Sequence, residues 1–308
     1  MKKKSFMIIG LVAMMLLVAG CDDNGDSTQR RDNPYIGGTD SLRITFDSSN
    51  PPSEVFVGDD FFIGLDIENL GEYDVPQGEF EIMIDGINPE TYGVGRSDLV
   101  KNPGMDLMGA EMDSQGTVFD GDSDYIEFGP LSYGSDLSNP LRDVTLQAIA
   151  CYSYGTEADT SICIKEDILT DDPSDVCIVN EEKRIFNSAG PVQVTSFTQS
   201  RRGSDTISFD FRVEHMGPGR VYGRGGSCDE DVEDEVYVSV DAPAGTDCSS
   251  LGGGTQGTLT RIEGSGRLVR CTLDVSDAES SFREPIGIDL EYTYRVVPST
   301  RIDVLPVD

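Results

Sequence analysis

Residues 61–71, FFIGLDIENLG, alternate apolar and polar side chains up to a glycine, and residues 207–217, ISFDFRVEHMG, do the same. Alternation with a period of two is typical of a β-strand with one buried face. Aligned at their glycines, the two stretches superpose three apolar positions: Ile63, Leu65 and Ile67 on Phe209, Phe211 and Val213. They therefore predict equivalent strands in a chain built twice from one β unit.

Further matches follow in the same order in both halves of the chain. Residues 79–85 match 235–241, residues 124–128 match 267–271, and Tyr152-Ser153-Tyr154 matches Tyr292-Thr293-Tyr294. Ile162 and Ile164 then match Ile302 and Val304, which predicts a hairpin around Glu157. The matched segments are rich in β-branched and aromatic residues, and Gly, Pro, Asn and Asp separate them. We therefore expect an all-β protein made of antiparallel two-sheet sandwiches.

The repeat sets the expected domain boundaries. A first sandwich is predicted at residues 41–165, an acidic linker at 166–190, and a second sandwich at 191–308 that ends in a strand. The pattern of strand, Asn-Leu-Gly turn and strand resembles the CARDB and other immunoglobulin-like modules of prokaryotic surface proteins. His215-Met216-Gly217 departs from the Asn-x-Gly of that pattern. The resemblance implies two tandem immunoglobulin-like antiparallel β-sandwich domains.

The N-terminus has the features of an export signal. Three lysines, residues 2–4, precede an apolar run at 6–19 that ends in Leu17-Val18-Ala19-Gly20-Cys21. This ending resembles the lipobox of bacterial and archaeal lipoproteins. It implies a signal peptide at 1–20, a lipid on Cys21 that anchors the chain to a membrane, and a location facing the periplasm or the cell exterior. An ordinary signal peptide and an uncleaved anchor are the alternatives. Residues 21–40 are polar and predict a flexible tether.

The composition excludes some functions. The formal net charge is −33, with 56 acidic residues, 23 Lys and Arg, and one His. A chain this acidic does not bind nucleic acid through a basic surface. With one His, no site that needs two imidazoles can form. No Gly-x-Ser-x-Gly sequence of a serine hydrolase is present.

Six cysteines remain after Cys21, and export favours disulfides between them. The predicted hairpin around Glu157 would place Cys151 opposite Cys163, while a bond between Cys163 and Cys177 is the rival. In the second unit, Cys248 is expected to meet Cys271. Cys228 completes the set of candidates and has no assigned partner.

Acidic loops at one end of the first sandwich suggest a calcium site. Calcium prefers several carboxylate and carbonyl oxygens on a flexible loop. The candidate ligands are Glu72, Asp74, Asp120, Asp122 and Asp124. The run at 120–124 is not an EF-hand, because its loop lacks the required Gly and Glu. The alternative is a set of solvated turns in a chain rich in acids.

The longest loop of the first unit carries Met105, Met108 and Met112. Met108 and Met112 are four residues apart, as on a short helix that would close the sandwich. A partner-contact loop is the alternative, because methionine adapts to contact surfaces.

Together these features predict a non-enzymatic, lipid-anchored surface protein that acts as an adhesion, binding or spacer module. Its expected partners are envelope or extracellular proteins or glycans, with calcium as the one candidate cofactor. Two alternatives remain. One is an envelope-assembly or secretion-accessory lipoprotein that binds a partner protein. The other is a metal-dependent hydrolase, which needs a concave cluster of acids with raised pKa values.

Overall fold

The computed structural model describes residues 33–170, 172, 175–228 and 234–307. These residues form one compact unit that begins at Asn33. The fold is all-β, and the described helices are single 3₁₀ turns: η1 (Gln77–Glu79), η2 (Pro89–Tyr92), η3 (Arg96–Leu99) and η4 (Ser249–Leu251). None of these described helices has the length or apolarity to span a membrane. The predicted leader and Cys21 lie outside the described residues.

Two sheets are built around the equivalent strands of the repeat, each of which pairs with an earlier strand and with a later strand. The first sheet is β1 (Leu42–Phe46), β3 (Asp60–Asn69) and β8 (Ser123–Ser132). The second is β10 (Glu181–Lys183), β12 (Val192–Arg201), β13 (Thr206–His215), β18 (Arg267–Asp274) and β16 (Asp247–Cys248). Residues 61–71 and 207–217 supply the central strands β3 and β13, as their alternation predicts.

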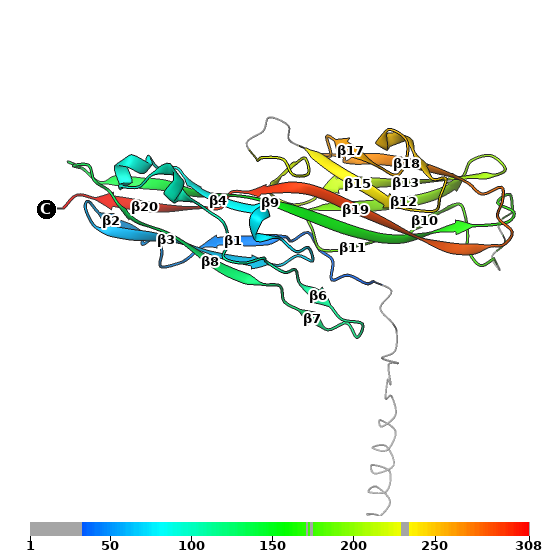
Figure 1. Ribbon diagram of the computed structural model, residues 1–308, viewed down its shortest axis with the longest axis horizontal. Helices are drawn as coiled ribbons and strands as arrows, with labels where there is room; N and C mark the ends of the chain where they lie inside the picture. Colours follow the sequence, from blue (N-terminus) through cyan, green and yellow to red (C-terminus); the bar gives the residue numbers. More distant parts are fainter. Residues whose placement is uncertain (1–32, 171, 173–174, 229–233, 308) are drawn as a thin grey trace, which may run out of the picture. The chain divides into compact units, whose positions relative to one another are not determined.

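A third sheet of ten strands packs against both of these (Figure 1). Its main path is β17 (Gln256–Thr260), β15 (Glu235–Asp241), β19 (Phe282–Val296), β9 (Leu141–Ile164), β20 (Ser299–Leu305) and β2 (Glu54–Phe56). Its other members are β4 (Phe80–Asp85), β5 (Val100–Lys101), β11 (Phe186–Asn187) and β14 (Arg220–Tyr222). A separate hairpin joins β6 (Glu111–Met112) to β7 (Val118–Phe119). Strand pairs are antiparallel except for β2 with β20. The sandwich-like, antiparallel all-β prediction is confirmed.

The hairpin predicted around Glu157 is wrong. Strand β9 continues without a turn for 24 residues and pairs with β19 along residues 150–164 and with β20 along residues 141–147 (Figure 1). Gly155 serves close packing rather than a turn, because a Cβ there would lie 2.5 Å from the Tyr73 ring.

The two halves of the repeat therefore exchange their last strands. Residues 155–164 pair with β19, beside β15, in the second half of the chain. Strand β20, from the end of the chain, pairs instead with β9 and β2 of the first half. These pairs cross the predicted boundaries 41–165 and 191–308, and the predicted linker 166–190 holds β10 and β11. Division into independent domains stays a prediction.

The repeated Tyr-x-Tyr motifs meet at the centre of this exchange. Tyr152 lies opposite Tyr294 and Tyr154 opposite Tyr292, with ring centroids 6.0 and 6.1 Å apart. The glycines of the repeat accommodate these rings, because a Cβ would lie within 1.7 Å of the Tyr154 hydroxyl at Gly71 and 2.4 Å of the Tyr294 hydroxyl at Gly217. Close packing thus explains why residues 61–71 and residues 207–217 both end in glycine.

Candidate functional site

A groove with a volume of about 750 Å³ lies over the centre of the ten-stranded sheet. Strands β9 and β19 contribute outward-facing side chains to its floor, because successive residues of a strand point to opposite faces. Tyr152, Tyr154, Tyr292 and Tyr294 are buried, and the residues between them belong to the groove. The floor residues whose side chains alternate with the tyrosines are Ile149, Cys151, Ser153, Glu291 and Thr293, and Tyr152, Tyr154 and Tyr292 also line the groove.

Loops from the two halves of the chain form the walls of the groove. Residues 78–81 and Asn102 line one side, and residues 224–228 line the other. A disulfide between Cys151 and Cys228 ties the second wall to the floor. Because the chain between these cysteines is long, the covalent link fixes a loop that sequence proximity could not hold.

This bond corrects one predicted pairing. Cys151 does not pair with Cys163, since both lie on the continuous strand β9, twelve residues apart and so separated by roughly 40 Å. Cys163 pairs with Cys177, the rival proposed from sequence, and the predicted Cys248–Cys271 bond is confirmed. The Cys151–Cys228 bond was missed because it joins the two halves, which only the strand exchange brings together.

Charges in the groove are unevenly neutralised. Arg224 donates to the carboxylate of Glu291 at 2.9 Å and stacks on the Tyr237 ring at 3.9 Å. Glu79 and Glu81 line the opposite wall and form no ion pair with any described residue. Burial, and then the negative charges of Glu291 and Glu79, raise the pKa of the Tyr73 phenol, which also lines the groove. The groove has excess negative charge.

One floor residue has an unsatisfied polar group. Thr293 is 3% exposed, and its hydroxyl finds no hydrogen-bond partner among the described residues. Buried hydroxyls in folded proteins are nearly always hydrogen-bonded. Ser153 lies opposite Thr293 in the β9–β19 register and also lines the groove.

The predicted calcium ligands do not form a metal-binding cluster in the described residues, where no group of three or more acids, His or Cys has suitable geometry. Several accept backbone hydrogen bonds instead. Asp74 accepts from the amide of Gly109 at 2.8 Å, Asp122 from that of Met108 at 3.2 Å, and Asp124 from that of Gly104 at 2.6 Å. Asp120 is exposed. Calcium binding stays a prediction.

The carboxylate of Glu72 joins three distant segments. It accepts hydrogen bonds from the amides of Ile36 at 2.9 Å, Gly37 at 2.8 Å and Ala189 at 2.7 Å. Tyr35 also donates to Asp159 at 2.8 Å. The last part of the predicted tether, residues 33–40, is therefore bound to the body, and residues 21–32 lie outside the described part of the chain.

The methionine loop is not helical, which corrects the predicted helical cap. Met105 and Met108 are 44% and 46% exposed, and Met112 belongs to the short strand β6. The backbone amides of Gly104, Met108 and Gly109 donate hydrogen bonds to carboxylates rather than to the carbonyl groups of a helix. A partner-contact role for this loop stays a prediction.

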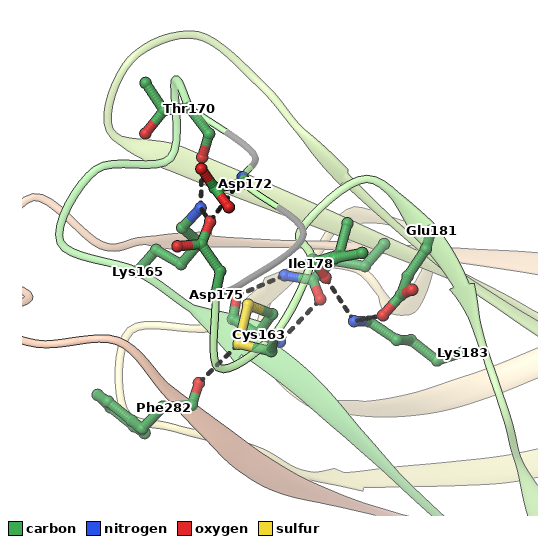
Figure 2. The surroundings of a disulfide bond; sticks show 11 residues. Cys163, Lys165, Thr170, Asp172, Asp175, Ile178, Glu181, Lys183 and Phe282 are labelled. Carbon is green, nitrogen blue, oxygen red and sulfur yellow. Dashed lines mark hydrogen bonds and ion pairs between the residues drawn. A yellow bond between two sulfur atoms is a disulfide. The ribbon is translucent and has the colours of Figure 1, made fainter.

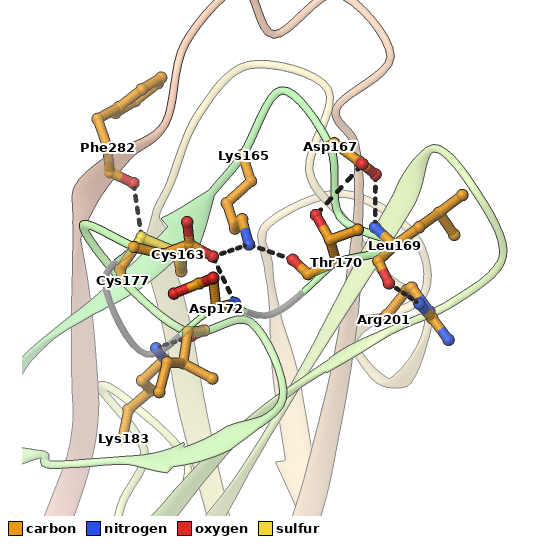
Figure 3. A network of polar contacts seen from close by, with 12 residues as sticks. Cys163, Lys165, Asp167, Leu169, Thr170, Asp172, Cys177, Lys183, Arg201 and Phe282 are labelled. Atoms are coloured by element: carbon orange, nitrogen blue, oxygen red, sulfur yellow. Dashed lines mark hydrogen bonds and ion pairs between the residues drawn. A yellow bond between two sulfur atoms is a disulfide. The ribbon is translucent and has the colours of Figure 1, made fainter.

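At the end of β9, a loop is closed by the Cys163–Cys177 disulfide (Figure 2). The buried Lys165 ammonium lies 2.6 Å from the Asp175 carboxylate, and its hydrogen bond lowers the pKa of that carboxyl. Figure 3 shows the continuation of this network, in which Asp167 accepts from Leu169 and Arg201 donates to the carbonyl of Leu169. The polar groups of this region form hydrogen bonds and an ion pair with one another, so we interpret the region as structural.

Glu157, Asp289 and Asp234 lie outside the groove and have raised pKa values, and the first two form a pair. Glu157 and Asp289 lie directly opposite each other on β9 and β19. Burial raises both pKa values, and neighbouring acids add to the effect: Asp289 and Asp159 act on Glu157, and Glu291 and Asp241 act on Asp289. Like charges placed opposite each other on neighbouring strands destabilise a sheet.

No protein-family model and no curated protein matches the chain. Among solved structures, a mutant of Salmonella alpha-2-macroglobulin aligns at 8% identity over 91% of this chain and 16% of that chain, with a TM-score of 0.18. Escherichia coli alpha-2-macroglobulin aligns at 11% identity over 86% and 32%, with a TM-score of 0.17. The chain thus spans under a third of either macroglobulin. The Enterococcus faecalis MSCRAMM ACE, which binds its ligands by the collagen hug model, aligns at 7% identity over 89% of this chain and 98% of that chain, with a TM-score of 0.13. With TM-scores this low, the fold class rests on the sheet topology.

Proposed function

We propose that this protein is an exported, lipid-anchored, non-enzymatic binding module of the cell envelope, with immunoglobulin-like sandwiches that present the central groove to a partner. The groove is the observation that carries the proposal. Its floor is a sheet shared by both halves, and its wall is fixed by a disulfide. A preorganised concave surface with a few polar groups is typical of a binding site.

Three disulfides support an oxidising location for the folded chain, such as the periplasm or the cell exterior. Lipidation of Cys21 would attach the chain to the membrane, and residues 22–32 would separate the body from it. Labelling of cells with a radioactive fatty acid is expected to label the protein but not its Cys21→Ser variant. Equal labelling of the two, or no labelling of either, would contradict lipid anchoring through Cys21.

Photo-crosslinking on intact cells tests the binding role. A photoreactive amino acid replaces Ile149 on the groove floor or, as the matched control, Asp59, which is exposed and does not line the groove. We expect a discrete crosslinked partner from position 149 and none of the same mass from position 59. Identical products from both positions, or none from position 149, would contradict a role for the groove in partner binding.

A further inference from the structure

We propose that the groove binds a Lys or Arg side chain of a partner polypeptide. This inference rests on the proposed function and names the chemistry of the ligand. Glu79, Glu81 and Glu291 supply three carboxylates around the groove, and Arg224 is the one cation among its described lining residues. Since Arg224 is already paired with Glu291, two carboxylates remain to attract a cation.

The buried hydroxyl of Thr293 is a second, independent indication of a ligand. Leaving a buried polar group without a partner costs about 1–3 kcal/mol. A hydroxyl oxygen accepts hydrogen bonds from an ammonium, which has three donors, or a guanidinium, which has five. A cationic side chain in the groove would satisfy Thr293 and the wall carboxylates together.

The size of the groove favours a side chain on a polypeptide over a free amine. A volume of about 750 Å³ leaves room for flanking backbone beside one cationic group. Ser153, Asn102 and the Tyr73 phenol line the same space and can exchange hydrogen bonds with peptide groups. Arg224 then acts as part of the wall, held by Glu291 and the Tyr237 ring.

The test measures the binding of a fluorescent decapeptide of alternating Arg and Ser by anisotropy in 0.15 M salt. The same peptide with citrulline in place of Arg removes the charge, and spermine is the free-amine competitor. We expect the citrulline peptide to bind at least 10-fold more weakly and spermine to compete poorly. Equal binding of the two peptides would overturn the proposal, and efficient displacement by spermine would assign the groove to free amines instead.

Because the whole protein is acidic, a charge-matched control is essential. Glu79→Gln with Glu81→Gln should weaken Arg-peptide binding about 10-fold. Asp59→Asn with Asp60→Asn, which makes the same change in net charge outside the groove, should weaken it less than 2-fold. Equal losses in the two double variants would show binding by bulk charge and overturn the proposal.

Substitutions of Thr293 separate ligand contact from folding. Thr293→Val removes the hydroxyl but preserves the shape, so we expect at least 3-fold weaker binding with an unchanged or higher Tm. Thr293→Ser keeps the hydroxyl and loses a methyl, so we expect retained binding with a lower Tm. Equal affinities of these two variants would contradict a ligand contact at Thr293. If the Arg peptide binds no better than the citrulline peptide while position 149 still crosslinks a partner on cells, the groove binds a partner of different chemistry and the proposed binding function stands.

Discussion

The two Tyr-x-Tyr motifs are alike on one face of the sheet and different on the other. Their tyrosines are buried against each other on the inner face in both halves. On the outer face, Ser153 is partly exposed, whereas Thr293 is 3% exposed and unsatisfied. The repeated motif thus places equivalent tyrosines in the core, while loops of unequal sequence build the groove above it. The tyrosines of the inner face are equivalent in the two halves, and the residues of the candidate site are not.

The largest expected effect comes from breaking the shared inner face. Tyr292→Ala should cost about 3–5 kcal/mol, because the side chain is fully buried in the sheet that both halves share. Calorimetry should show one transition at a lower temperature, since the exchanged strands couple both halves. Tyr292→Phe, which loses the hydrogen bond to Thr156, should cost about 1 kcal/mol. Two separate transitions, one of them at the wild-type temperature, would contradict the strand exchange.

Two disulfides allow a comparison of the junction between the two halves, where Cys151 bonds to Cys228, with the end of β9, where Cys163 bonds to Cys177. Cys151 and Cys228 are 77 residues apart, and Cys163 and Cys177 are 14 apart. In the chain-entropy model, losing the first bond costs about 4.5 kcal/mol and losing the second about 3 kcal/mol. Chemical denaturation of the two double Cys→Ala variants should therefore rank the junction disulfide as the larger loss. The reverse order would show that the junction bond does not restrain the exchanged strands.

The calcium prediction concerns the acidic loops of the first half. Calcium at ten times its Kd would stabilise the native state by about 1.4 kcal/mol. The prediction requires a rise in Tm with calcium but not magnesium, measured after chelator treatment. The rise should be lost when Asp120, Asp122 and Asp124 are changed to Asn. An equal change in Tm with both ions would mean that these carboxylates bind no calcium specifically and serve only to accept hydrogen bonds from the loop amides.

The smallest expected effect comes from the acidic pair on the outer face. The raised pKa values of Glu157 and Asp289 mean that these two carboxyls bind protons more tightly in the folded protein than in the unfolded chain. Their contribution to stability should therefore rise as the pH falls from 7 toward the unfolded pKa values near about 4. Glu157→Gln should stabilise the protein by roughly 0.5 kcal/mol at pH 7 and flatten this rise, as measured by denaturation at several pH values.

Asp85→Asn is the control for that measurement, because Asp85 is exposed and lies opposite the neutral Gln147. It removes one negative charge without removing a like-charged cross-strand pair, so it should change the stability at pH 7 less than Glu157→Gln does. A matching stabilisation by Asp85→Asn would mean that net charge, rather than the opposite placement of Glu157 and Asp289, sets the pH response.

Local sequence determined which residues form strands and which face of each strand is buried. The alternation in residues 61–71 and 207–217 specified β3 and β13, because the period of two is a property of the strand itself. The Cys248–Cys271 bond followed from the same local reasoning, since both cysteines lie within one half of the repeat.

Only the tertiary structure decided which strands pair. Residues 155–164 have the same alternation whether they turn back on their own half or continue into the other, so the sequence pattern does not distinguish a hairpin from an exchange. The groove, the Cys151–Cys228 bond and the buried Thr293 hydroxyl all depend on that choice. They are contacts between residues far apart in the chain, and periodicity, a short-range signal, contains no information about them.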